Sequence, residues 1–369
     1  MAISKVHSST NTSINTSEVP FPCPPATQSV RRKENKIMST KASRTVESVA
    51  AEVAAVAKVD ETAVREAIYQ AIRIGSLKQS EFGFLTFNGV LPLQLPDGLR
   101  LAILPDIHAP AHHEQIMWAV KEFLADYNPH ILVLIGDVGD VFGLSAWPKN
   151  ARIPENLAWE VGETRELIDE LIECSGAMHT FITMGNHEDR NRRWLMNVGS
   201  KIAGVVGMGS REPIMSFHEL LGYKPGDPVT FIYDLQNAGG FGGGLKLNGD
   251  LKLIHGYVVR PRPGASPRAV SDKDLQSVVH GHTHRLGANM REITKGVVRS
   301  YEIGMLVNPS HSMMGYANLL NNWHPGLAVA TVVNGKVHMN MIPIIEVEID
   351  GRPRHVFQWN GKLYTSTDR

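Results

Sequence analysis

The sequence predicts an α/β protein, because short apolar runs alternate with segments of helical periodicity over most of the chain. Two runs, Leu101 to Leu104 and Ile131 to Ile135, are continuously apolar, as expected of strands that are buried on both faces. Helical stretches lie between and after them near residues 113–126 and 159–174, and residues 178–184 are expected to form a third buried strand. This order favours a sheet of buried strands that are connected by helices.

Three segments are expected along the chain. Residues 1–43 are rich in Ser, Thr, Asn and Pro and lack apolar periodicity, so we expect a disordered tail. Residues 44–95 carry two short helical patterns, then a predicted strand at residues 82–87 and the turn pair Asn88-Gly89. Such a small helical domain fits a winged-helix-like DNA binder or a structural or oligomerisation module, and both alternatives stay open. Residues 96–369 are expected to form the main domain.

Short strands dominate the second half of the main domain. Each is a brief run of apolar and β-branched residues bounded by turn residues. They are expected at residues 229–233, 251–254, 278–280, 297–303, 327–333 and 337–344. The main domain is therefore predicted to combine an alternating first half with a second half that is rich in strands.

The composition excludes several classes of protein. Of 369 residues, 43% are apolar and 20% are charged, which allows a sizeable core. The formal net charge is 37 − 37 = 0, which excludes a polycation that coats nucleic acid or membrane through its total charge. Two Cys cannot build a disulfide framework, and they indicate a reducing compartment. Since no run approaches the roughly 18 apolar residues of a membrane span, and no secretory segment is found, we expect a cytoplasmic protein without a membrane partner.

Polar residues that suit a metal site stand at the carboxyl ends of the predicted strands, where α/β sheets place their functional sites. The first apolar run leads into Asp106-Ile107-His108, in which a carboxylate and an imidazole would face the same side of an extended chain. Such a pair is half of a site for a divalent metal. Similar groups follow later runs: Gly136-Asp137-Val138-Gly139-Asp140, Gly185-Asn186-His187-Glu188, His255-Gly256 and Gly281-His282-Thr283-His284.

One such group alone is weak, because most pairs of this kind are only two solvated side chains. All five in this order resemble the calcineurin-like metallophosphoesterase superfamily over roughly residues 100–345. The local forms at residues 185–190 and 280–287 are most similar to phage- or prophage-encoded members. The resemblance implies a sandwich of two mixed sheets flanked by helices, with a dinuclear metal centre at the strand ends. The small N-terminal helical domain would be an appendage to it.

The resemblance also implies a role for each motif residue. Seven residues would hold two divalent ions: Asp106, His108 and His284 the first, Asn186, His255 and His282 the second, and Asp137 both. His187 would donate a proton to the leaving oxygen, and Asp140 would orient His187. Nitrogen and oxygen ligands without sulfur suit Mn, Fe, Zn or Ni, of which we expect Mn.

This centre predicts a hydrolase of phosphate esters. Two cations would lower the pKa of a shared water and give a bridging hydroxide for in-line attack on phosphorus. Guanidinium groups suit phosphate binding, so the candidates for holding the substrate are Arg190, Arg260 and Arg285.

Val141 bears on the choice of substrate. It directly follows Asp140, where the phosphoprotein phosphatases of the superfamily carry an Arg that grips a phosphomonoester. Its presence favours a phosphodiesterase or nuclease, with DNA, another nucleic acid or a nucleotide as partner. Two alternatives stay open: a phosphomonoesterase that acts on a phosphoprotein or nucleotide, and a non-catalytic interaction scaffold.

Overall fold

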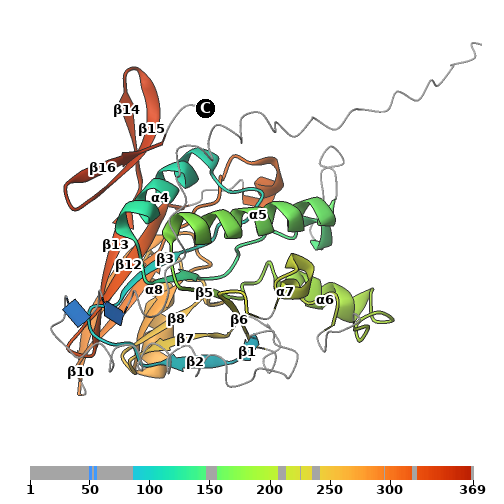
Figure 1. Ribbon diagram of the computed structural model, residues 1–369, viewed down its shortest axis with the longest axis horizontal. Coiled ribbons are helices and arrows are strands. Elements are labelled where there is room, and N and C mark those ends of the chain that lie inside the picture. Colours follow the sequence, from blue (N-terminus) through green and yellow to red (C-terminus); the bar gives the residue numbers. More distant parts are fainter. Residues whose placement is uncertain are drawn as a thin grey trace, which may run out of the picture. The chain divides into compact units, whose positions relative to one another are not determined.

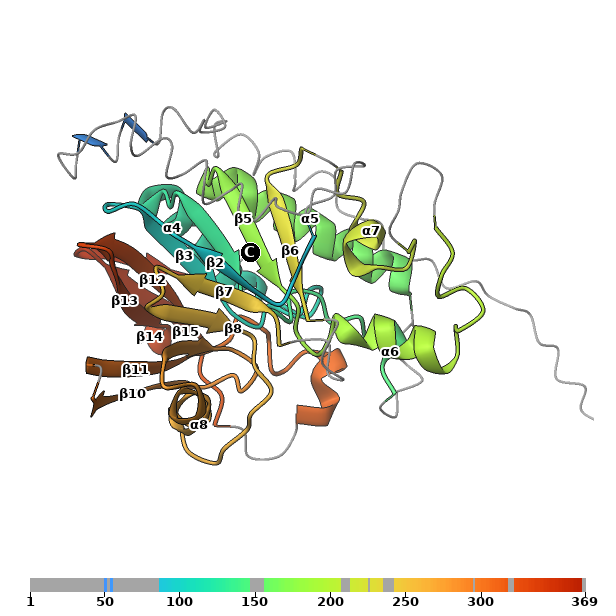
Figure 2. The ribbon, with the colours of Figure 1, turned by 90° about the horizontal axis from the view of Figure 1, so that it is seen from below.

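The computed structural model describes residues 50–51, 54–55, 86–146, 156–206, 213–224, 226–234, 242–294, 296–317 and 322–366. The expected tail at 1–43 lies outside the described residues, as does most of the expected helical domain between 44 and 85. The four described residues of that stretch are helical, and two of them, Ala50 and Ala54, belong to the main hydrophobic core. Figures 1 and 2 show the predicted sandwich of two sheets with flanking helices.

The first sheet has seven strands in the order β1-β6-β5-β4-β3-β12-β13. They are β1 (Thr86–Asn88), β3 (Arg100–Leu104), β4 (Ile131–Leu134), β5 (His179–Thr183), β6 (Val229–Tyr233), β12 (Gly326–Val333) and β13 (Lys336–Pro343). Strands β3 to β6 are parallel, so their carboxyl ends lie at one edge of the sheet. Helices α4 (Glu114–Tyr127) and α5 (Leu157–Ser175) connect β3 to β4 and β4 to β5 and lie side by side, as both views show.

The second sheet has six strands in the order β10-β11-β9-β8-β7-β2. They are β2 (Val90–Leu93), β7 (Gly244–Leu247), β8 (Leu251–Ile254), β9 (Ser277–His280), β10 (Leu286–Ile293) and β11 (Gly296–Ile303). Helix α8 (Ala265–Asp274) connects the parallel strands β8 and β9. Alternate residues of both sheets, such as Ile103, Val133 and Leu253, form one buried cluster. This shared core fixes the carboxyl ends of β3, β4 and β5 relative to those of β8 and β9.

Strands β1 and β2 do not form the hairpin that Asn88-Gly89 predicts. Strand β1 pairs in parallel with β6 of the first sheet, whereas β2 pairs in parallel with β7 of the second. Gly89 has a φ of 107°, its N–H donates to Tyr233 of the first sheet, and its carbonyl accepts from Gly244 of the second. The positive φ at Gly89 therefore lets the chain pass from the first sheet to the second and does not form a hairpin turn. Residues 86–93, expected in the small N-terminal domain, supply an edge strand to each sheet.

A third sheet follows the sandwich. Its antiparallel strands, none of which was predicted, are β14 (Ile345–Ile349), β15 (Arg352–Trp359) and β16 (Lys362–Thr365). It packs against α4 through aromatic rings, since Phe123 lies 5.4 to 6.2 Å from the rings of Phe357, Trp359 and Tyr364. No helix among the described residues is long and apolar enough to cross a membrane.

Candidate metal centre

The seven predicted ligands follow five strands that come from both sheets. Asp106 and His108 follow β3, Asp137 follows β4, Asn186 follows β5, His255 follows β8, and His282 and His284 follow β9. Five of the seven side chains are buried, and Asn186 and His282 are half-buried. Because the two groups of parallel strands end at the same edge of the sandwich, residues up to 178 positions apart in the chain meet there.

The ligand atoms form two overlapping groups. In the first, donor atoms of Asp106, His108, Asp137 and His284 all lie within 4.8 Å of one another. In the second, Asp137, His255 and His282 meet the same limit, and Asn186 Oδ1 lies 3.1 Å from His255 Nε2. The structure therefore brings together all seven predicted ligands, and Asp137 belongs to both groups.

The chemistry of these donor atoms fits divalent cations. His108 donates from Nδ1 to Asp140 Oδ2 at 3.1 Å, and its Nε2 faces His284 Nε2 at 3.1 Å. His255 likewise donates from Nδ1 to the carbonyl of Ile135 at 3.1 Å, while its Nε2 lies 3.3 Å from Asp137 Oδ2. A neutral imidazole whose Nδ1 carries the proton presents a lone pair at Nε2. Lone pairs that converge with carboxylate oxygens in a buried space are the arrangement that a bound cation requires.

The electrostatics keep Asp137, His108 and His282 in forms that bind metal, but they favour a proton on His255. Burial raises the pKa of Asp137, but the positive charges of His255 and His187 outweigh burial and hold that pKa well below its usual range. Burial lowers the pKa of His108 to about 4 and that of His282 to about 3, so both rings are neutral at pH 7. For His255, the charge of Asp137 outweighs burial and raises the pKa to about 9. A divalent ion would replace that proton, since metal ligands must be deprotonated.

The backbone at most of the predicted ligands is left-handed and not extended. Five ligands have positive φ angles between 45° and 65°: Asp106, His108, Asp137, His282 and His284. Asp106 and His108 were predicted to face the same side because the chain was expected to be extended there. The chain is not extended, so that reason is wrong, but donor atoms of the two side chains do lie in one group. Left-handed backbone at a residue other than Gly costs about 1–3 kcal/mol and is concentrated at functional sites. Backbone hydrogen bonds from neighbouring loops, such as His108 N–H to the carbonyl of Asp137, hold these angles.

Two motif glycines are required because ligands pack directly against them. A Cβ atom at Gly185 would lie 2.1 Å from Asp137 Oδ1, and one at Gly281 would lie 2.8 Å from Asp106 Oδ2. Real Cβ atoms essentially never approach other atoms within 3.0 Å. Any larger residue would therefore displace a carboxylate of the cluster.

Asp140 connects the predicted general acid to the ligands. Its Oδ2 accepts from His108 Nδ1 and from His187 Nδ1, both at 3.1 Å, and its Oδ1 accepts from Arg190 Nη1 at 2.7 Å. Burial raises the pKa of Asp140, but the charge of His187 and the hydrogen bond from His108 hold it well below its usual range. His187 Nε2 points to the cluster, at 3.8 Å from Asp137 Oδ2. Asp140 thus orients one predicted ligand and the predicted acid at once.

The three predicted substrate arginines lie in different surroundings. Arg190 is largely buried and bonded to Asp140, with its Nη2 3.2 Å from His187 Nε2. Arg260 is exposed on the loop that follows His255, and Arg285 donates from Nη1 to the carbonyl of Arg260. The structure therefore places Arg260 and Arg285 together at the rim and Arg190 beside the predicted acid.

Sequence reasoning missed Glu188, whose side chain is 3% exposed. Its Oε1 accepts from the backbone N–H groups of Val138 and Gly139 at 2.7 and 3.0 Å. Its Oε2 accepts from those of Asp137 and Gly185 at 3.1 and 2.8 Å. Glu188 thus fastens the loop that carries Asp137 to the loop that carries Asn186. Its place directly after His187 was visible in the sequence, but its partners become apparent only when the loops meet.

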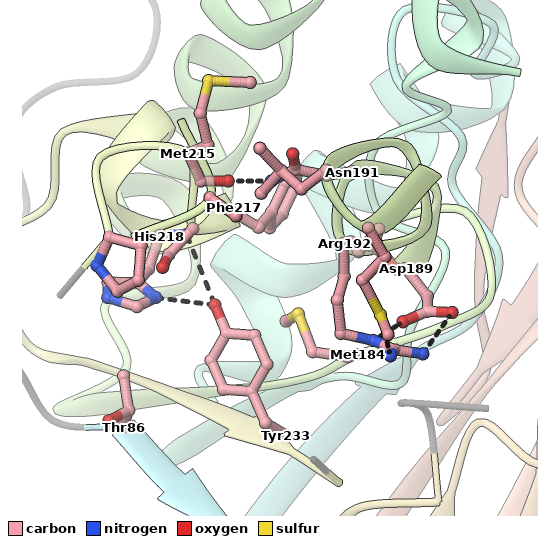
Figure 3. A pocket seen from close by; sticks show the side chains of 15 residues that line it. Thr86, Met184, Asp189, Asn191, Arg192, Met215, Phe217, His218 and Tyr233 are labelled. Atoms are coloured by element: carbon pink, nitrogen blue, oxygen red, sulfur yellow. Dashed lines mark hydrogen bonds and ion pairs between the residues drawn. The ribbon is translucent and has the colours of Figure 1, made fainter. Parts of the chain in front are cut away.

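A cavity of about 310 Å³ lies near this centre, between α6 (Asp189–Asn197), α7 (Phe217–Leu221) and the ends of β5 and β6. Its lining is mainly apolar and includes Met184, Leu195 and Phe217. Figure 3 shows His218 and Tyr233 facing each other there, with 2.6 Å between Nδ1 and the phenol oxygen. None of the seven predicted ligands is among its described lining residues, but Glu188 is, so this cavity adjoins the metal centre.

The chain is similar to several known proteins. A family model described as calcineurin-like phosphoesterase matches residues 99–286, about half of the chain. The chain is 24% identical over 275 residues to the gene 54 protein of Mycobacterium phage L5, which covers 69% of this chain and 97% of that protein. The gene 54 protein of Mycobacterium phage D29 is also 24% identical over 275 residues, covering 70% and 98% of the two chains.

Two solved structures are also similar to this chain. Vps29 from Chaetomium thermophilum has a TM-score of 0.36 and 11% identity, over 73% of this chain and 97% of that one. A phosphatase from Mycoplasma pneumoniae has a TM-score of 0.34 and 13% identity, over 67% and 94%. The family model matches half of the chain, and the five motifs meet at one edge of the sandwich. The chain therefore belongs to the calcineurin-like phosphoesterase family and is a hydrolase of phosphate ester bonds.

Proposed function

We propose that the protein is a manganese-dependent phosphodiesterase that cleaves nucleic acid or nucleotide diesters. The observation that carries the proposal is the pair of donor groups that share the buried carboxylate of Asp137. Asp106, His108 and His284 would hold one ion with Asp137, and Asn186, His255 and His282 would hold the other. When bound, two such ions stabilise charge on the phosphoryl oxygens and lower the pKa of an attacking water.

The side chains around the centre suit proton donation to a leaving oxygen. His187 Nδ1 is held by Asp140, so its Nε2 is the atom that faces the cluster. The pKa of Asp140 lies well below its usual range, so a charged carboxylate orients the His187 ring. A positioned general acid of this kind contributes about 10²- to 10⁴-fold to the rate.

The preference for diesters rests on the surroundings of Asp140. Val141, which follows it, is buried and has no charge with which to grip a dianionic monoester. Arg190 is bonded to Asp140 through Nη1, so part of its guanidinium is already occupied by a carboxylate. Arg260 and Arg285 at the rim suit the phosphates that flank a scissile diester in a longer chain.

The test compares two substrates that differ only in ester class, bis(4-nitrophenyl) phosphate and 4-nitrophenyl phosphate, with Mn²⁺ present. We expect turnover of the diester by the wild type and by His338→Ala, a control whose histidine is exposed on β13. Turnover of the monoester alone would favour a phosphomonoesterase. Turnover of neither substrate would favour a non-catalytic scaffold.

A second comparison tests the role of His187. The 4-nitrophenolate ion leaves readily without a proton, whereas the alkoxide of a dinucleotide does not. We therefore expect His187→Ala to slow cleavage of thymidylyl-thymidine much more than cleavage of bis(4-nitrophenyl) phosphate, with unchanged metal content. Equal losses on both substrates would contradict proton donation by His187.

A further inference from the structure

The loop between β8 and α8, residues 255–264, leads from the metal centre along the rim. It begins at His255, whose Nε2 belongs to the cluster, and continues through residues that are mostly exposed. Tyr257, two residues after His255, is 58% exposed, although aromatic rings usually bury most of their surface. Arg260 and Arg262 are exposed on the same loop. One short segment that begins at a predicted ligand therefore presents an aromatic ring and two guanidinium groups to solvent.

The loop is held in one conformation by bonds at several points. The backbone N–H of Arg260 donates to Ser266 Oγ at 3.1 Å, and that of Gly264 donates to the buried Glu302 Oε2 at 2.5 Å. Arg285, which directly follows His284, donates to the carbonyl of Arg260. A ligand that binds this loop would therefore lose little affinity to ordering it.

The positive charge of the loop is not neutralised by neighbouring acids. No Asp or Glu occurs between residues 251 and 271. Asp272 pairs with Arg268 and Arg291, and Asp274 pairs with Lys252 at 3.1 Å. Within the part of the chain that the structure describes, Arg260 and Arg262 thus have no carboxylate partner. Glu302, at the end of the loop, is bonded to the N–H of Gly264 and to the hydroxyl of Thr283.

We propose that this loop binds a single-stranded polynucleotide, with the ring of Tyr257 stacked on a base and Arg260 and Arg262 bound to neighbouring phosphates. The proposal rests on the proposed phosphodiesterase function and names its substrate class. Aromatic rings alternating with cations are the means by which proteins bind single strands without reading sequence. In an intact duplex both faces of each base are already stacked, so an exposed ring favours unpaired strands.

The experiment measures binding by fluorescence anisotropy, using the full chain with Mn²⁺ and His187→Ala to prevent cleavage. The probes are labelled oligo-dT and oligo-U of about ten nucleotides, with a hairpin duplex for comparison. We expect Tyr257→Ala to weaken single-strand binding about 5- to 100-fold, whereas Tyr257→Phe keeps it within about twofold. Binding of oligo-dT, oligo-U or both supports the proposal, and the difference between them shows whether the 2′-hydroxyl matters.

Salt dependence tests the arginines separately. Each phosphate contact on a single strand contributes about −0.7 to the slope of log affinity against log salt. We expect Arg262→Gln to reduce the magnitude of the slope by about that amount, and Lys336→Gln, on β13, to leave it unchanged. An unaltered affinity in Tyr257→Ala, or a duplex that binds as tightly as single strands, would overturn the proposal.

Turnover of a small diester separates this inference from the proposed function. Methyl 4-nitrophenyl phosphate is too short to reach both a base site and the metal centre. If the wild type does not cleave it, the phosphodiesterase proposal fails whatever the loop binds. If the wild type does cleave it and Tyr257→Ala leaves strand binding unchanged, only the proposal for the loop fails.

Discussion

Replacing Glu188 with Gln changes one atom of a carboxylate that accepts four backbone N–H groups. A Gln amide keeps one oxygen, which can satisfy either Val138 and Gly139 or Asp137 and Gly185. Its NH₂ group then faces the other two donors and leaves them unsatisfied. A buried unsatisfied donor costs about 1–3 kcal/mol, so two of them cost about 2–6 kcal/mol.

Urea unfolding of Glu188→Gln and of the wild type measures this loss. Glu348→Gln is the control, because Glu348 is exposed on β14. Since two of the four donors flank the predicted ligands Asp137 and Asn186, we also expect Mn²⁺ affinity to fall about 10- to 100-fold, the loss typical of residues that support metal ligands. Stability within about 0.5 kcal/mol of the wild type, together with unchanged Mn²⁺ affinity, would refute this view of Glu188.

Three further predictions follow from the same structure. Asp140→Ala should weaken Mn²⁺ binding about 10- to 100-fold by removing the carboxylate that accepts from the ligand His108, and equilibrium dialysis against Mn²⁺ checks this. Gly185→Ala should lose Mn²⁺ and stability because its Cβ would collide with a carboxylate, whereas Gly162→Ala, in open space on α5, should gain about 0.5–1 kcal/mol in urea unfolding. Burial raises the pKa of the Cys174 thiol to about 12. In a Cys23→Ser variant at pH 8, a thiol reagent should therefore react with Cys174 only after the protein unfolds. Fast reaction of the native protein would contradict this prediction.

The polar groups of the site could be found in the sequence because each follows an apolar run, whereas the role of each residue as a ligand came from the family resemblance. Asp106, Asp137 and His255 each follow an apolar run, and parallel strands carry their ends to one edge. The alternation of strands and helices from residue 100 onward likewise predicted the α/β class. The arrangement of two facing sheets came from the family resemblance, since periodicity does not show which sheet a strand joins.

Other features depend on contacts between distant segments and have no local pattern. Asn88-Gly89 indicates a positive φ but not whether the chain turns back or crosses to another sheet. The left-handed backbone at Asp106 and His108 is imposed by neighbouring loops and contradicts the usual preference of such residues. The sheet at residues 345–365 is stabilised by aromatic rings that reach Phe123, more than 200 residues earlier in the chain.

The central claim is that the chain holds two divalent ions that share Asp137. Electron paramagnetic resonance of the Mn²⁺-loaded protein tests it most directly, because two manganese ions joined through one carboxylate give a spin-coupled spectrum. We expect that spectrum in the wild type and its loss in Asp137→Asn. An uncoupled spectrum of isolated Mn²⁺ in the wild type, or a coupled spectrum that survives in Asp137→Asn, would contradict a dinuclear centre built on Asp137.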